Sequence, residues 1–179
     1  MSRNPIYLGF AETLEPTIPP IYQALDIEQI FDTTLSLMDD KLATGVDFAY
    51  FANACDYWHK PKALSIYIVD ADEGRTLNLQ ARGKDYATNV LSYPSGLPDE
   101  VLAVMDEIEM GELILCHDVV VNEAATQHKS FQAHLTHLII HGILHLLGFD
   151  HEISDDDADE MEGFEIEILA ALGFDNPYQ

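Results

Sequence analysis

The alternation of apolar and polar side chains along the chain predicts a small set of strands. Residues 64–69 alternate and are rich in β-branched side chains, which is typical of a strand. The same reasoning predicts strands over 89–93 and over the short apolar run 112–116. Residues 5–18 are expected to be extended and to end in a turn at Pro19 and Pro20, because proline disfavours continued regular structure.

Helical spacing of apolar residues predicts helices elsewhere. The expected helices cover 26–40, 71–81, 118–147 with an interruption near 128–130, and a last stretch that begins at Ser154. A region rich in Phe and Tyr up to Trp58 is expected to be helical or irregular. The segment 94–110 is acidic and is punctuated by proline and glycine. Short strands and longer helices together predict an α+β domain.

Two residues mark the expected ends of the carboxy-terminal helices. Gly148 stands where a glycine is expected to terminate the preceding helix. Ser154 can cap the last helix, whose opening aspartates favour the positive end of the helix dipole. The inward stripe of that helix is predicted to be Met161, Phe164, Ile168 and Leu172. Its other acidic residues are expected mostly to face water as a solvated surface: Glu160, Glu162, Glu165 and Glu167.

Length and composition fit one domain over residues 1–179, in which a mixed β-sheet of about four strands is packed with helices. Residues 1–60 contribute the least to this assignment. The most apolar stretch, 137–149, is too short to cross a bilayer of roughly 30 Å, so a buried helix and no membrane association are expected. The first twenty residues lack the features of a secretory signal.

The two cysteines, Cys55 and Cys116, are too few for a disulfide framework. We expect both to be small core residues in a protein of the reducing cytoplasm. The formal net charge of −24 excludes a broad basic surface for nucleic acid, because such surfaces neutralise phosphates with lysine and arginine. Any contact with RNA must therefore be local, and Lys129 is the last basic residue of the chain apart from histidines.

The segment HGILHLLGFDH carries the clearest chemistry of the sequence. His141 and His145 are four residues apart, so a helix places both imidazoles on one face, one turn from each other. Gly148 permits the left-handed backbone that ends the helix and brings His151 back to the same point. Three imidazole ligands with one open position are typical of a catalytic zinc ion. The sequence therefore predicts a zinc site at the end of a long helix, with a hydrolytic activity.

The same histidine spacing occurs in metzincin proteases, which makes a metalloprotease the rival interpretation. In that motif the residue after the first histidine is the glutamate that acts as general base. Here that position is Gly142, which has no side chain. A phosphodiester substrate places different demands on the site, because a metal ion and an arginine can stabilise charge on the non-bridging oxygens.

Three blocks, RGKDYATNVLSYP, HGILHLLGFDH and the closing ALGFDNPY, together resemble the YbeY family of bacterial endoribonucleases. The similarity covers about 64–178, whereas the part before Leu64 shows little of it and is longer than the family would imply. The resemblance implies a mixed sheet covered by helices, one zinc ion and cleavage of single-stranded RNA in ribosomal RNA maturation, including the 3′ end of 16S rRNA. Two departures are Phe149 in place of a tyrosine and Glu112 in place of an aspartate after Gly111.

Carried over to this sequence, the resemblance implies a metal held by His141, His145 and His151, with Arg82 as the functional arginine. Arg82 is then expected to contact the scissile phosphate, because a guanidinium matches phosphate oxygens, although a surface salt bridge is the alternative. Lys84 is expected to help to hold the RNA strand.

Several neighbours of the motif keep open roles. His137 is a candidate for supporting a ligand or facing RNA, although an ordinary structural role is the simpler interpretation for it and for His134. Asp150 and Glu152 are candidates for orienting a ligand or accepting a proton. An alternative function is a metal-stabilised ribosome-assembly factor without nuclease activity, which would bind ribosomal protein or RNA.

Overall fold

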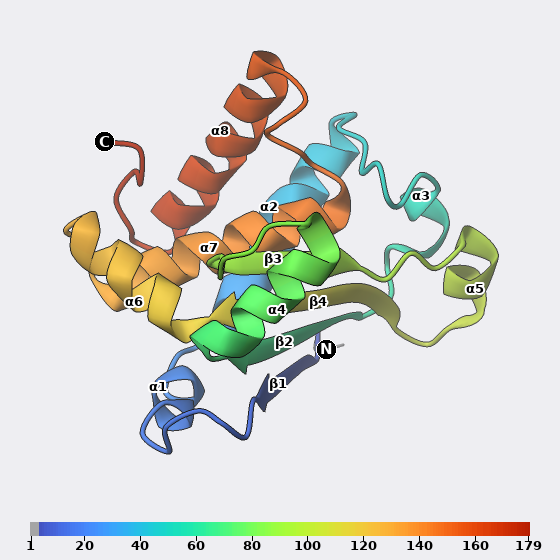
Figure 1. The fold of residues 1–179 in the computed structure, drawn as a ribbon. Coiled ribbons are helices and arrows are strands. Elements are labelled where there is room, and N and C mark those ends of the chain that lie inside the picture. Colours follow the sequence, from blue (N-terminus) through green and yellow to red (C-terminus); the bar gives the residue numbers. More distant parts are fainter. Residues whose placement is uncertain (1–3) are drawn as a thin grey trace.

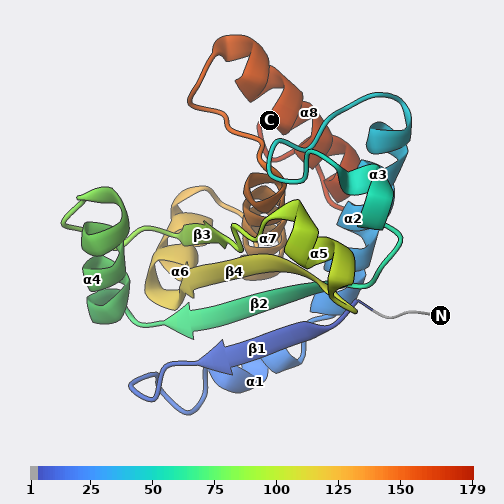
Figure 2. The same cartoon turned by 90° about the vertical axis from the view of Figure 1, so that its right-hand side faces the viewer.

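Four strands form one mixed sheet in the computed structural model, which describes residues 4–179. Figure 2 shows them side by side in the order β1-β2-β4-β3. The first three are parallel and β3 is antiparallel to β4. The strands are β1 (Ile6–Phe10), β2 (Lys62–Val69), β3 (Val90–Pro94) and β4 (Ile108–Cys116). The α+β fold with a mixed sheet of about four strands is therefore confirmed.

The longest helices gather around one central helix. Helix α7 (Phe131–Leu147) packs against β3 and β4, and α8 (Asp155–Ala171) lies over α7 on the side away from the sheet, as Figure 1 shows. Helix α2 (Ile27–Ala43) contacts both α7 and α8, and α6 (His117–Thr126) packs beside α7. Helix α4 (Ala71–Arg82) follows β2 and contacts β4 and α6. Almost every apolar side chain of α7 is buried as a result.

Three short helices complete the chain, and two of them, α1 and α5, correct the sequence-based expectations. Helix α1 (Pro19–Gln23) begins at the two prolines that were expected to form a turn, because proline fits the first turn of a helix, where its missing N–H is not needed. Helix α3 (Ala54–Tyr57) lies in the aromatic region before β2. Helix α5 (Asp99–Val104) and the first residues of β4 lie in the acidic segment for which no element was predicted.

The predicted break at 128–130 is confirmed. His128 adopts a positive φ of 55°, which separates α6 from α7. The hydroxyl of Ser130 then accepts a hydrogen bond from the Ala133 amide at the start of α7. Ser154 caps α8 in the same way through the Asp157 amide, as its position in the sequence predicted. These caps fix the first residue of α7, which carries the first two histidines of the motif, and the first residue of α8, which covers α7.

Gly142 faces the sheet. A Cβ atom added at Gly142 would lie 2.7 Å from Leu113 Cδ2 in β4, and Leu113 is fully buried. Helix α7 therefore rests directly on β4 at this residue, with the Ser92 hydroxyl of β3 donating to the Gly142 carbonyl at 3.4 Å. A glutamate at this position would have to occupy the packed interface between helix and sheet.

The environments of the cysteines differ from expectation in one case. Cys116 is buried at the end of β4, as expected, where its Sγ would lie 3.2 Å from a Cβ added at Gly74 of α4. Cys55 is exposed, so its assignment to the core was wrong, because the first turn of α3 turns its side chain to solvent. Both thiols are free. Among residues 4–179, no helix combines the length and apolar character needed to span a membrane.

Gly148 ends α7 in a conformation and a space that only glycine fits. Its φ is 108°, and its amide donates to the His145 carbonyl at 3.0 Å. An added Cβ would lie 2.7 Å from the Ala49 Cβ and 2.9 Å from the Tyr50 amide nitrogen, which itself donates to the Leu147 carbonyl. The chain can therefore turn toward His151 only where a residue lacks a side chain.

We expect Gly148→Ala to lower the free energy of unfolding by about 3 kcal/mol, because alanine must adopt a left-handed backbone and its Cβ crowds residues 49–50. The matched control is Gly173→Ala, which also has a positive φ, of 87°, but has no atom within 4 Å of an added Cβ. Its expected loss is about 1 to 2 kcal/mol, from the backbone alone. Urea unfolding of both variants measures the difference, and equal losses would contradict the crowding at Gly148.

Candidate metal centre

Three imidazoles converge at the carboxyl end of α7. One ring nitrogen from each of His141, His145 and His151 lies within 4.8 Å of the other two. The Nε2 atoms of His141 and His145 are 3.0 Å apart, and zinc bound tetrahedrally at 2.0–2.1 Å separates its ligand nitrogens by about 3.3 Å. The predicted convergence of the three histidines is confirmed, and together they form a cluster that could bind a metal ion.

The hydrogen bonds of the two helical histidines fix which nitrogen carries the proton. Nδ1 of His145 donates to the Phe149 carbonyl at 2.9 Å, and Nδ1 of His141 donates to Glu165 Oε1 at 2.8 Å. In the neutral rings both Nε2 atoms are then unprotonated, and their lone pairs face each other. Such a pair at 3.0 Å is repulsive unless a proton or a metal cation lies between the atoms, and two lone pairs that face each other in this way fit a divalent metal ion.

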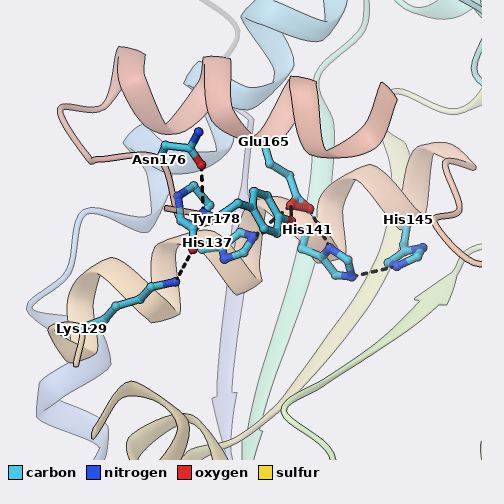
Figure 3. A network of polar contacts seen from close by, with 8 residues as sticks. Lys129, His137, His141, His145, Glu165, Asn176 and Tyr178 are labelled. Carbon is cyan, nitrogen blue, oxygen red and sulfur yellow. Dashed lines mark hydrogen bonds and ion pairs between the residues drawn. The ribbon is translucent and has the colours of Figure 1, made fainter. Parts of the chain in front are cut away.

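Glu165 is the residue of this site that the sequence analysis missed, and the expectation that it faces water was wrong. Its side chain is 0% exposed. Its carboxylate receives hydrogen bonds from His141 Nδ1, from His137 Nε2 at 2.9 Å and from the Tyr178 hydroxyl at 2.7 Å (Figure 3). The position was recognisable, because residue 165 lies four residues after Met161 and so continues the inward stripe of α8.

The electrostatic setting keeps the carboxylate charged and one ligand neutral. Burial alone would raise the pKa of Glu165, but the hydrogen bonds from His137 and His141 outweigh burial and hold its pKa at about 2. Burial, followed by the neighbouring His141 and His151, lowers the pKa of His145 to about 4. His145 is therefore neutral near pH 7, which a metal ligand must be. Burial and the bond to Glu165 raise the pKa of Tyr178, so its hydroxyl stays a donor.

Arg82 lines a cavity of about 530 Å³ together with the three histidines. It is the last residue of α4, and its guanidinium is 3.7 Å from the carboxylate of Glu152, which follows the third histidine. Both side chains are largely exposed, and an ion pair of this length in water contributes little. The surface salt bridge that was the alternative for Arg82 is therefore present. It is too weak to fix the position of the Arg82 side chain near the histidine cluster.

The structure separates the remaining candidates. Asp150 lines the same cavity as Arg82, and its carboxylate accepts a hydrogen bond from the Glu152 amide at 2.8 Å. The groups that orient the rings of His141 and His145 are Glu165 and the Phe149 carbonyl, and neither ring is hydrogen-bonded to Asp150 or Glu152. Lys84 is exposed in the loop after α4 and does not line this cavity. His137 lies against Glu165, and His134 is buried against Glu123 of α6.

Comparison with known proteins gives the same family as the sequence motifs. Residues 26–173 match the family described as Endoribonuclease YbeY. The match begins well before Leu64, so the expectation of little similarity in the amino-terminal part was wrong. A solved structure, the solution structure of TM1509 from Thermotoga maritima, is 22% identical, with a TM-score of 0.49 over 93% of this chain and 91% of that chain.

Curated relatives carry the same description. The Endoribonuclease YbeY of Psychrobacter cryohalolentis is 52% identical over 151 residues, which are 83% of this chain and 97% of that protein. The Endoribonuclease YbeY of Acinetobacter baylyi is 56% identical over 116 residues, which are 65% of this chain and 73% of that protein. The match over most of the chain and this level of identity show that the chain belongs to the YbeY endoribonuclease family.

Proposed function

We propose that this protein is a metal-dependent endoribonuclease that cleaves single-stranded RNA in ribosomal RNA maturation, including the 3′ end of 16S rRNA, and so acts in ribosome biogenesis. The observation that carries the proposal is the convergence of three imidazole nitrogens beside Arg82 in one open cavity. The description of the relatives as endoribonucleases supports the same reaction. The two free cysteines are compatible with action in the cytoplasm.

The proposed cofactor is one zinc ion per chain, held by His141, His145 and His151. Three imidazoles leave a tetrahedral ion one position for water or substrate, and a zinc ion in such a site acts as a Lewis acid and lowers the pKa of bound water. Imidazoles also accept nickel, copper and iron, so the preference for zinc is part of the proposal.

The residues around the cluster have different proposed roles toward the substrate. Arg82 binds the non-bridging oxygens of the scissile phosphate and stabilises the charge that develops there, because its fork of donors matches two phosphate oxygens. Lys84 follows in the next loop and contacts the strand further from the cleaved bond. Asp150 and Glu152 are the carboxylates of this cavity that are available to accept a proton.

This geometry gives less support to two other functions. A metzincin-like protease needs a general base after the first histidine, and here Gly142 packs against Leu113 and leaves no room for one. A ribosome-assembly factor without nuclease activity would suit the acidic composition, because an acidic protein attracts basic partners such as ribosomal proteins. Such a factor would have no use for an open ligand position facing an arginine.

We expect Arg82→Ala to lower kcat/KM on a single-stranded RNA by about 100- to 1,000-fold, the usual loss when one donor to a developing charge is removed. His145→Ala should abolish cleavage and lower the metal content. The control is Arg75→Ala on the same helix as Arg82. It removes an equal charge, in this case from an exposed ion pair with Asp85. The nuclease proposal fails if metal-loaded wild type and the Arg82 variant leave the RNA equally intact.

Removal of the charge that orients His141 is expected to weaken metal binding. We predict that Glu165→Gln lowers the affinity for zinc by about 10- to 100-fold, because the carboxylate fixes the ring and raises its basicity. Competition with a chromogenic chelator measures this affinity. Glu160→Gln, an exposed acid on the same helix, serves as control and should bind zinc as wild type does. Equal affinities for all three proteins would show that Glu165 does not support the ligand.

The acidic surface predicts a weak salt dependence of RNA binding. Arg82 and Lys84 neutralise few phosphates, so log K against log salt should have a slope of about −1.4 for a single strand, about −0.7 for each contact. Fluorescence anisotropy of a labelled oligonucleotide between roughly 50 and 300 mM salt measures the slope. A slope of roughly −5 or steeper, equivalent to about eight ion pairs, would contradict a local contact.

A further inference from the structure

A second cavity, of about 440 Å³, opens onto the same histidine cluster. It shares Asn89, His141 and His151 with the cavity that holds Arg82. Both cavities therefore meet at the candidate metal centre. A phosphate of an RNA strand placed at this centre would therefore have the second cavity on one side of it.

The walls of the second cavity are held in place by hydrogen bonds between distant parts of the chain. Lys129, between α6 and α7, donates from Nζ to the Pro177 carbonyl at 2.7 Å. The Tyr178 hydroxyl donates to Glu165 of α8, and Figure 3 shows the carboxy-terminal segment joined in this way to Lys129 and to Glu165. The cavity is thus formed before a ligand arrives, as small-molecule sites usually are.

The charge of this lining disfavours a phosphate. Three carboxylates border the cavity, those of Glu123, Glu162 and Glu165, against the single ammonium of Lys129. A phosphate placed there would meet like charge, whereas a nucleobase carries no charge near pH 7. Of the parts of a nucleotide, the base is therefore the one that fits this cavity.

The polar atoms of the lining mostly accept hydrogen bonds. The Glu123 carboxylate is fixed by Asn89 Nδ2 at 3.0 Å and by His134 Nε2 at 2.7 Å, and its side chain keeps 32% of its exposure. A carboxylate offers about four lone pairs, so Glu123 retains acceptor capacity. His134 and His137 each donate from Nε2, which leaves Nδ1 an acceptor in the neutral ring. Both Nδ1 atoms are buried without a hydrogen-bond partner, so the acceptor that a base in the cavity can reach is the partly exposed Glu123.

We propose that this cavity binds the base of a nucleotide adjacent to the scissile phosphate and selects bases with an exocyclic amino group, a selectivity that rests on the proposed nuclease function. Acceptors at Glu123 match the amino donors of cytosine, adenine and guanine, as carboxylates accept from the cytosine amino group elsewhere. Uracil has no amino group, and its one ring donor in a nucleotide, N3–H, lies between two carbonyl oxygens, which the carboxylate repels. Cytosine and uracil are the sharpest comparison, because at C4 they differ only in amino group against carbonyl.

The first experiment measures binding of CMP and UMP to the zinc-loaded protein by NMR titration. We expect CMP to bind about tenfold more tightly, the discrimination of one good base contact. Chemical shift changes should include the Glu123 and His134 amides. Glu123→Gln keeps the side-chain size but adds a donor, so the ratio of the CMP and UMP affinities should fall to roughly one or two. Glu160→Gln removes the same charge at a site away from the cavity, so it should leave this ratio unchanged. Equal binding of CMP and UMP by wild type would overturn the proposal.

A second measurement separates this inference from the nuclease proposal. Cleavage of oligocytidine and oligouridine of equal length should show the same preference in kcat/KM, and Glu123→Gln should reduce it. If RNA is cleaved without any difference between the two substrates and CMP is not preferred, the base site is wrong and the nuclease stands. If no RNA is cleaved but CMP is still preferred over UMP, the nuclease proposal fails and the base site stands.

Discussion

The buried carboxylate of Glu165 is the interaction on which the rest of the site depends. A charge without exposed surface is strongly unfavourable unless it is paired and hydrogen-bonded, and three donors from α7 and the carboxy-terminal segment meet that requirement. The same contacts attach α8 to α7 and hold the ring of His141. Removal of one donor would leave part of the carboxylate unsatisfied, so the ring of His141, the helix pair and the end of the chain are coupled through one side chain.

Helix α7 serves different purposes on its different sides, and this explains its composition. One side presents His141 and His145 at a separation of one turn. Another meets the sheet so closely that only Gly142 fits against Leu113. At the end of the helix Gly148 lets the chain reverse beside 49–50, which returns His151 to the first two rings. The packing of the fold thus requires a glycine at position 142, where the protease mechanism would need a glutamate.

The sequence predicted the parts of the molecule that local pattern determines. Spacing and a capping glycine were enough to place the three histidines together, and Ser154 marked the start of α8. The spacing of Glu165 from Met161 marks it as inward, but it was missed because nothing local shows how a buried acid is paired, and its partners lie 24 and 28 residues away. The acidic segment that forms α5 escaped for a related reason, since its helix is anchored by Tyr57 and Asn53, whose side chains donate to Asp99.

The acidity of the protein is compatible with an RNA substrate because attraction and selection are separated in space. Arg82 and a divalent cation at the histidine cluster can supply positive charge where the phosphate must lie, over a distance that the Debye length of about 8 Å limits at physiological salt. Carboxylates a short way along the strand, such as Glu123, then meet a base and not a phosphate. An acidic surface beyond this region weakens non-specific binding to nucleic acid, so the protein favours strands that offer a suitable base at the cleaved bond.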